Sequence, residues 1–228
     1  MRSSLFACLA LLVGCGSSEA EPVPLSALAG RTLRAIVTDV DSLQRPIPPG
    51  SYRLTVLFSA GEPCVRLSDG ARALLDGAPM TLEPGALSGS GGRQTCQPPR
   101  ATFDFDPAQW GASAPEDALV VLSDDSHTVR LVLGGARAKR RFVRADSAGT
   151  TLRRGQTQTY VWQPVEDAVA QGLRVSLTPT SGGLTTALPV EQTGGTGRFL
   201  VPEASNEGEY VLRLDGNATL PITTCEGV

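Results

Sequence analysis

Two aspartates have the spacing that could support carboxylate chemistry. Asp104 and Asp106 alternate with Phe103 and Phe105. In a strand this alternation places both carboxylates on one face and both rings on the other. Such a pair could begin a glycosidase site or supply oxygen ligands to calcium, giving a carbohydrate-active or calcium-dependent β-sandwich protein. An amphipathic strand with an acidic, solvated face has the same pattern, so we favour that structural interpretation.

The only histidine, His127, is the sole imidazole that could serve as a base for a nucleophile. It lies in a polar stretch, residues 123–128, between two apolar runs, which predicts a hairpin turn rather than a catalytic triad. The sequence contains no nucleophile elbow, phosphate-binding loop or zinc-protease motif. We therefore assign no catalytic residue and no cofactor, and expect a non-enzymatic protein.

One cluster of basic residues stands out. It could contact anionic lipid headgroups or polysaccharide. Alternatively, it marks a solvated edge strand whose charges prevent pairing with other chains, the interpretation that we favour. The formal net charge of −3 argues against a nucleic-acid partner. The cluster consists of Arg137, Lys139, Arg140, Arg141 and Arg144.

The N-terminus predicts export. Arg2 precedes the apolar run 5–13, which is too short to span a membrane. The following Leu12-Val13-Gly14-Cys15 resembles the lipobox of bacterial lipoproteins. The resemblance implies a signal peptide over residues 1–14, lipid on Cys15 and a membrane anchor outside the cytoplasm. In the best-known sorting scheme, Gly16 after the cysteine favours the outer membrane. Envelope proteins or glycans would be its other partners.

The mature chain would begin with a lipidated cysteine and a flexible tether, residues 15–30, rich in glycine, serine and proline breakers. An oxidising compartment favours pairing of the remaining cysteines. Cys64 and Cys96 both lie in proline-bearing loops, so we predict a disulfide between them, worth about 3 to 4 kcal/mol of stability. Cys225 would then be unpaired, although pairing of Cys225 with one of the other two remains open. With no closely spaced cysteines and one histidine, no metal site is predicted.

From Thr32 onward, the chain contains short β-branched and apolar runs separated by turn residues, which predicts an all-β fold. Hydrophobic residues make up 41% and charged residues 19%, as expected of a chain that folds. Tyr52, Leu54, Val56 and Phe58 alternate and should share one buried face. Asp76-Gly77 predicts a tight hairpin turn, with Leu74 and Met80 on the paired strands. The strands expected in the first half are 32–38, 51–59, 71–75, 102–105, 119–123, 128–133 and 137–144.

A change in composition near residues 146–150 predicts a boundary between a domain at 31–145 and another at 146–228. In the second, Tyr160-Val161-Trp162-Gln163-Pro164-Val165-Glu166-Asp167 resembles an early strand of fibronectin type III domains. Gly208-Glu209-Tyr210-Val211-Leu212-Arg213-Leu214 resembles the strand that carries a core tyrosine in immunoglobulin-like sandwiches. These resemblances imply two immunoglobulin-like β-sandwich domains, with Trp162 and Tyr210 as core anchors. The strands expected in the second domain are 158–162, 173–178, 184–190, 198–201, 209–214 and 218–222.

Overall fold

The computed structural model describes residues 20–41, 52–59, 63–89, 94–106, 110, 116–138, 140–146, 149–163 and 171–227. The predicted signal peptide, Cys15, residues 16–19 of the predicted tether and Lys139 lie outside the described residues. The rest of the predicted tether is not a flexible connection: residues 21–23 form a strand that pairs with residues 65–67, and Leu25 and Leu28 are buried. The fold is all-β and its large sheets are antiparallel, in a sandwich-like arrangement, as the sequence predicts. Within the described residues, no helix has the length and apolar character needed to cross a bilayer.

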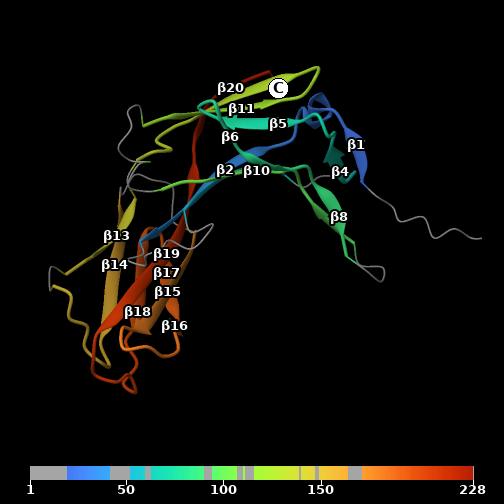
Figure 1. The fold of residues 1–228 in the computed structure, drawn as a ribbon. Helices are drawn as coiled ribbons and strands as arrows, with labels where there is room; N and C mark the ends of the chain where they lie inside the picture. Colours follow the sequence, from blue (N-terminus) through green and yellow to red (C-terminus); the bar gives the residue numbers. More distant parts are fainter. Residues whose placement is uncertain are drawn as a thin grey trace, which may run out of the picture.

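The largest sheet of the described residues has seven antiparallel strands and extends through both lobes of the molecule (Figure 1). Its strands come from distant parts of the sequence, so their pairing is set by long-range contacts. In spatial order they are β16 (Thr186–Leu188), β15 (Gln171–Pro179), β19 (Tyr210–Leu220), β2 (Leu33–Asp41), β3 (Arg53–Phe58), β10 (Arg100–Asp104) and β7 (Thr81–Glu83).

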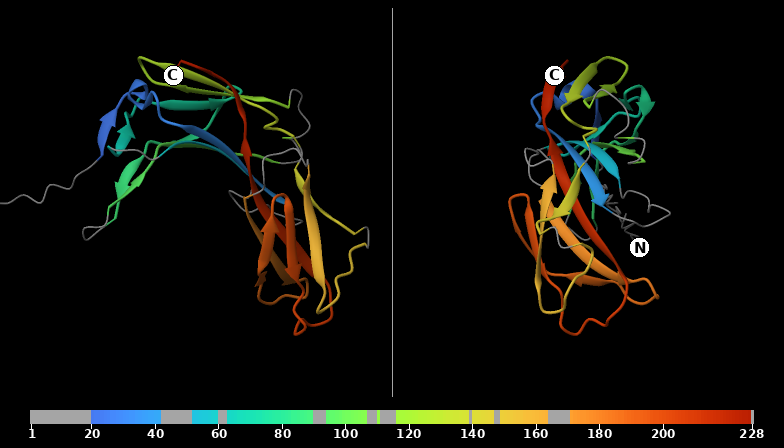
Figure 2. Two further views of the ribbon diagram at one scale, coloured as in Figure 1. Left: turned by 180° about the vertical axis from the view of Figure 1, so that it is seen from behind. Right: turned by 90° about the vertical axis from the view of Figure 1, so that its left-hand side faces the viewer.

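Two further sheets accompany the seven-stranded sheet, one in each lobe (Figures 1 and 2). The five-stranded sheet consists of β20 (Ile222–Glu226), β12 (Thr128–Leu133), β11 (Ala118–Ser123), β5 (Arg72–Leu75) and β6 (Ala78–Pro79). The four-stranded sheet consists of β13 (Arg141–Arg144), β14 (Thr157–Gln163), β18 (Thr196–Leu200) and β17 (Val190–Thr193). Smaller pairs are formed by β1 (Glu21–Val23) with β4 (Val65–Leu67) and by β8 (Ala86–Ser88) with β9 (Thr95–Gln97), and a 3₁₀ turn, η1, spans Leu25–Leu28.

The core follows the alternation predicted from the sequence. Tyr52, Leu54, Val56 and Phe58 are all buried, while the residues between them are only half-buried. In the other lobe, Trp162 is buried and its ring lies 4.7 Å from that of Phe142 in an edge-to-face arrangement. The predicted role of Trp162 as a core anchor is therefore confirmed.

Tyr210 is a partly buried residue at the start of β19. Its hydroxyl donates a hydrogen bond of 3.0 Å to the carbonyl of Asn206, four residues upstream. A tyrosine hydroxyl that bonds back to the preceding backbone is a feature of immunoglobulin-like sandwiches. Tyr210 thus fastens the loop before β19 to the strand.

The predicted hairpin turn at Asp76-Gly77 is confirmed. Both residues have positive φ, 48° and 85°, as a type I′ turn requires. The turn joins β5 to β6 and pairs Leu75 with Ala78. Met80, expected on the second strand, lies one residue beyond the end of β6.

One boundary between predicted strands was wrong. The segments 209–214 and 218–222 were expected to be separate strands, because Asp215-Gly216-Asn217 has the composition of a turn. Instead, β19 continues through these residues as one strand from Tyr210 to Leu220. Its backbone pairs with β15 on one side and β2 on the other, and these two ladders outweigh the local turn preference.

The strands of the two predicted domains share sheets. β19 pairs with β15 and with β2, which lie on opposite sides of the predicted boundary at residue 146. The last strand, β20, pairs with β12 of the first half. These ladders therefore join strands from both sides of the predicted boundary. The division into domains 31–145 and 146–228 stays a prediction.

Candidate functional site

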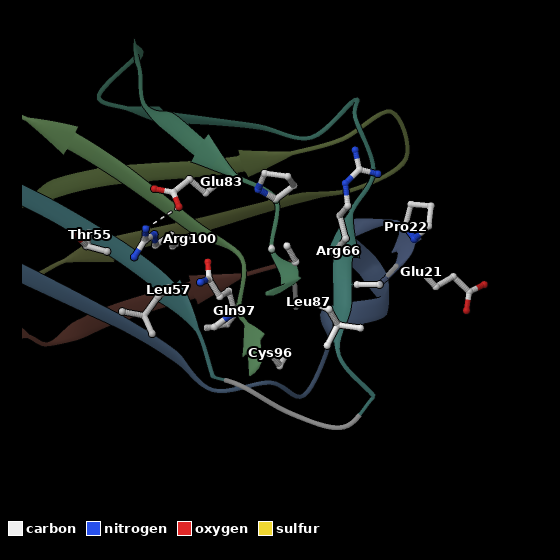
Figure 3. A pocket seen from close by; sticks show the side chains of 15 residues that line it. Glu21, Pro22, Thr55, Leu57, Arg66, Glu83, Leu87, Cys96, Gln97 and Arg100 are labelled. Carbon is white, nitrogen blue, oxygen red and sulfur yellow. Dashed lines mark ion pairs between the residues drawn. The ribbon is translucent and has the colours of Figure 1, made fainter. Parts of the chain in front are cut away.

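A groove of about 1300 Å³ opens beside the N-terminal end of the described chain (Figure 3). Its floor is the outer face of the seven-stranded sheet, and its opposite wall is formed by β1, β4 and the β8–β9 hairpin. None of the lining residues, all within the described part of the chain, is aromatic. They are Ala20, Glu21, Pro22, Thr55, Leu57, Arg66, Glu83, Pro84, Gly85, Ala86, Leu87, Cys96, Gln97, Pro98 and Arg100.

Strand geometry places the floor residues. Because Leu54 and Val56 point into the core, Thr55 and Leu57 must point to the opposite face of β3. Register places Leu57 directly opposite Arg100 of β10. The floor therefore combines Thr55 and Leu57 of β3 with Arg100 of β10, a strand that is distant from β3 in sequence.

The charged part of the floor is an ion pair. Arg100 lies opposite Glu83 in the ladder between β10 and β7, and the guanidinium Nη2 is 2.7 Å from Oε2 of Glu83. Both side chains are about half exposed, so they can exchange this partner for a ligand at small cost. Arg66 on the opposite wall similarly pairs with Asp69, outside the groove lining. The groove thus offers both signs of charge next to apolar side chains.

A disulfide holds the hairpin wall. Cys64, just before β4, is bonded to Cys96 of β9, with a Cα–Cα distance of 5.6 Å. The pairing predicted from the sequence is confirmed, and Cys225 is a free, exposed cysteine. The bond matters here because few residues of β8 and β9 contribute to the core.

A glycine allows the hairpin to start. Gly85 has φ of 93°, and a Cβ there would lie 3.0 Å from the carbonyl oxygen of Val65 and 3.1 Å from that of Gln97. Only glycine fits this conformation and this close approach without strain. Gln97 also donates through Nε2 to the hydroxyl of Ser88 across the hairpin, at 3.0 Å. Figure 3 shows Gln97 and Leu87 on this wall, across from Leu57.

The carboxylate pair predicted as an alternative site is not part of this groove. Asp104 accepts two hydrogen bonds from Arg53, at 2.5 and 2.9 Å, across the ladder between β10 and β3. The hydrogen bond from Arg53 lowers the pKa of Asp104, opposed by burial. A glycosidase general acid needs a raised pKa, so the lowered pKa of Asp104 does not suit that role. Asp106 is exposed beyond the end of β10.

The phenylalanines of that segment behave as predicted for an amphipathic strand. The rings of Phe105 and Trp110 stack at 4.5 Å, and Phe103 lies 6.0 Å from Trp110. Arg137 covers the same ring, with its guanidinium 5.2 Å from the centroid. The aromatic face is thus covered and the acidic face is solvated.

The basic cluster does not form one exposed cationic patch. Arg137 pairs with Asp76 at 2.6 Å. Arg140 is buried and donates to the carbonyls of Gly135, Ala136 and Ala138 at 2.8 to 3.3 Å, so it closes the turn before β13. Arg144 pairs with Asp146 and donates to the carbonyls of Gly149 and Thr151.

Arg141 is the exposed member of the described part of this cluster. It lies on β13, which is an edge strand of the four-stranded sheet. This position agrees with the favoured interpretation of a charged strand edge. The alternative, a patch that contacts anionic lipid headgroups or polysaccharide, loses three of its arginines to contacts within the fold.

His127 lies in the hairpin turn between β11 and β12, as predicted. Asp124 organises this turn: its carboxylate accepts from the backbone N–H groups of Leu25, Ser126 and His127 at 2.5, 2.9 and 2.8 Å. These hydrogen bonds, led by that from Leu25, lower the pKa of Asp124. The Nε2 atom of His127 contacts the carbonyl of Gly227, so the ring links the turn to the end of the described chain.

Among the residues that the structure describes, no group of three or more His, Cys, Asp or Glu side chains could hold a metal ion.

Sequence reasoning missed the groove residues Leu57, Glu83, Arg66 and Arg100. Alternation predicted the outward orientation of Thr55 and Leu57, but no sequence signal showed that a hairpin would face them.

No protein-family model matches the chain, and neither curated proteins nor solved structures give a significant match.

Proposed function

We propose that this protein is a non-enzymatic binding protein of the bacterial envelope, anchored by lipid on Cys15, and that the groove beside the disulfide-bonded hairpin is its binding site. The observation that carries the binding role is the groove itself, with its rigid sheet floor and its cross-linked wall. Binding sites are commonly concave and apolar with a few placed polar groups.

The groove suits an extended polypeptide segment. Its lining alternates aliphatic side chains and prolines with the ion pair of Arg100 and Glu83 and the amide of Gln97. Aromatic rings, on which flat ligand rings stack, are missing from the lining residues, all of which are described. An extended peptide presents alternate side chains to a sheet-like surface, and its own charges can replace the partners of the half-exposed ion pair.

The proposed anchor would keep the groove close to the membrane. Ala20 lines the groove and is five residues from Cys15. An extended chain spans at most about 3.5 Å per residue, so this connection reaches about 17 Å. A ligand presented near the membrane surface is therefore within reach of the site, and acyl chains on Cys15 would make the attachment durable.

Two measurements test the two parts of this proposal separately. For the anchor, mass spectrometry of the mature N-terminus and membrane fractionation of the wild type and Cys15→Ser are compared. We expect acylated Cys15 and release of the variant into the soluble fraction. An unmodified cysteine in a soluble wild-type protein would refute the anchor.

For the groove, random peptides displayed on phage are selected on the detergent-solubilised full chain. Leu57→Arg places a large cation on the groove floor, and Thr193→Arg on the exposed edge strand β17 is the matched control. Selected peptides should lose at least about tenfold in affinity for Leu57→Arg, or about 1.4 kcal/mol. Equal binding to both variants would exclude the groove as the site.

A further inference from the structure

The strand β20 is an edge strand of the five-stranded sheet. It is the end strand in the sheet order, and within the described residues its only strand partner is β12. Figures 1 and 2 show it at the rim of its lobe, beside the C-terminus. Its outer side therefore presents backbone N–H and C=O groups that face no other strand of the described segments, which is a template for pairing with another chain.

Most of this edge is free of charged side chains and proline. Thr223, Thr224 and Cys225 are exposed and uncharged, and the only charge on β20 is Glu226 at its end. Natural sheets block their edges with charged side chains or proline. Such residues occur on four other edge strands of this protein: Arg141 and Arg144 on β13, Glu83 on β7, Glu191 on β17 and Pro79 on β6. The three-residue edge strand β16 has none.

The sequence of β20 fits a second copy of itself. When two such strands pair antiparallel about a two-fold axis at Cys225, each Thr224 lies opposite Glu226 of the other copy. No like charges then face each other. The two Cys225 residues lie opposite, where Cα–Cα distances in antiparallel pairs are about 4.5 to 5.5 Å. That separation lies within the range that a disulfide spans.

We propose that β20 is a homodimerisation edge, through which two copies of the chain pair antiparallel and form an intermolecular disulfide between their Cys225 thiols. The Cys64–Cys96 bond indicates a compartment in which thiols are oxidised. A pair of five-residue strands buries far less than the roughly 1,000 Å² typical of a stable interface. The strands therefore align the thiols, and the covalent bond makes the dimer durable.

The oxidation needs a disulfide as electron acceptor, such as oxidised glutathione or an exported thiol–disulfide oxidoreductase. One Cys225 thiolate attacks the acceptor and forms a mixed disulfide, releasing one acceptor thiol. The second Cys225 thiolate then attacks the Cys225 sulfur of this intermediate. The products are the Cys225–Cys225 bond and two acceptor thiols, so two electrons and two protons pass to the acceptor.

The test uses the full chain. Cells are treated with N-ethylmaleimide before lysis, and dimers are detected by non-reducing electrophoresis and by mass spectrometry of the linked peptide. The detergent-solubilised protein is then oxidised with glutathione disulfide to measure the rate of dimer formation. We expect a Cys225-linked dimer that reductant dissociates and that is absent from Cys225→Ser.

Charge variants test the paired strands independently of the thiol. Thr224→Glu sets two glutamates opposite each other at both ends of the pair and should slow dimer formation about fivefold. Thr224→Lys faces Glu226 of the other copy and should not slow it. Thr193→Glu, on the edge strand β17, is the matched control and should behave as the wild type.

Random collision of exposed thiols is tested by Thr193→Cys in a Cys225→Ser background. If this variant cross-links as fast as the wild type, β20 has no pairing role and the proposal fails. It also fails if Cys225 stays reduced or is linked to a different thiol in cells, or if Thr224→Glu and Thr193→Glu dimerise at equal rates. Circular dichroism of each variant confirms that it is folded before rates are compared.

Discussion

Removal of the Cys64–Cys96 disulfide should destabilise the protein chiefly through the unfolded chain. The bond closes a loop with a sequence separation of 32 residues. The chain-entropy relation for such a loop gives about 12 cal/mol/K, or about 3.7 kcal/mol at room temperature. For a chain of this size, that change corresponds to a fall in Tm of roughly 7 to 15 °C.

The experiment compares Cys64→Ser/Cys96→Ser with its parent, both in a Cys225→Ser background, by urea unfolding. The free energy of unfolding should fall by about 3 to 4 kcal/mol, and reduction of the parent should have the same effect. Hydrogen exchange should also accelerate in β8 and β9, because the hairpin contributes little buried surface of its own.

Two results would refute this account of the disulfide. A loss of less than about 1 kcal/mol with unchanged hydrogen exchange would mean that packing already restrains the hairpin. A loss well above about 5 kcal/mol would exceed what loop closure can supply and would require broken native contacts. Unchanged affinity for groove-binding peptides in the double variant would show that the wall does not need the cross-link.

Three further predictions concern the stability of the fold, and urea unfolding tests each of them. Arg140→Ala leaves three turn carbonyls without their donor and should cost about 2 to 4 kcal/mol, whereas Arg141→Ala, at an exposed position, should change stability by less than about 0.5 kcal/mol; equal effects would contradict the assigned roles. Gly77→Ala should cost about 1 kcal/mol from its φ of 85° alone, since a Cβ there meets no atom within 4 Å; no loss would mean that the turn relaxes. Asp124→Ala removes the acceptor of three backbone N–H groups and should cost about 1 to 3 kcal/mol at neutral pH. Because the folded pKa of Asp124 is lowered, this stabilisation is present above the unfolded pKa of about 4 and is lost as the pH falls through the folded value, so the two proteins should converge in acid; a gap that persists there would argue against an ionic contribution.

Local signals predicted much of the secondary structure. Alternation identified the buried face of β3, and Asp76-Gly77 identified the turn between β5 and β6, because both signals depend on residues that are neighbours in sequence. The same local reasoning failed at Gly216. There, turn residues lie within β19, since pairing on both sides of the strand supplies hydrogen bonds that the local sequence does not reveal.

The roles of the arginines depended on tertiary contacts. A run of positive charge between residues 137 and 144 predicted either a patch or an edge. The structure turns Arg140 inward onto carbonyls and leaves Arg141 on the edge strand β13. Sequence alone could not separate these neighbours, because the path of the chain before β13 determines which guanidinium is enclosed.

The sequence by itself determined that the chain is all-β, that its inward faces alternate and that Cys64 and Cys96 can pair, because strand period, turn chemistry and cysteine number are local or compositional properties. Only the tertiary structure decided that Leu57, Arg100 and Glu83 would form a groove floor and that Cys225 would lie on an open edge. These placements depend on register between strands that are distant in sequence. Register follows from the packing of whole sheets, to which every strand contributes.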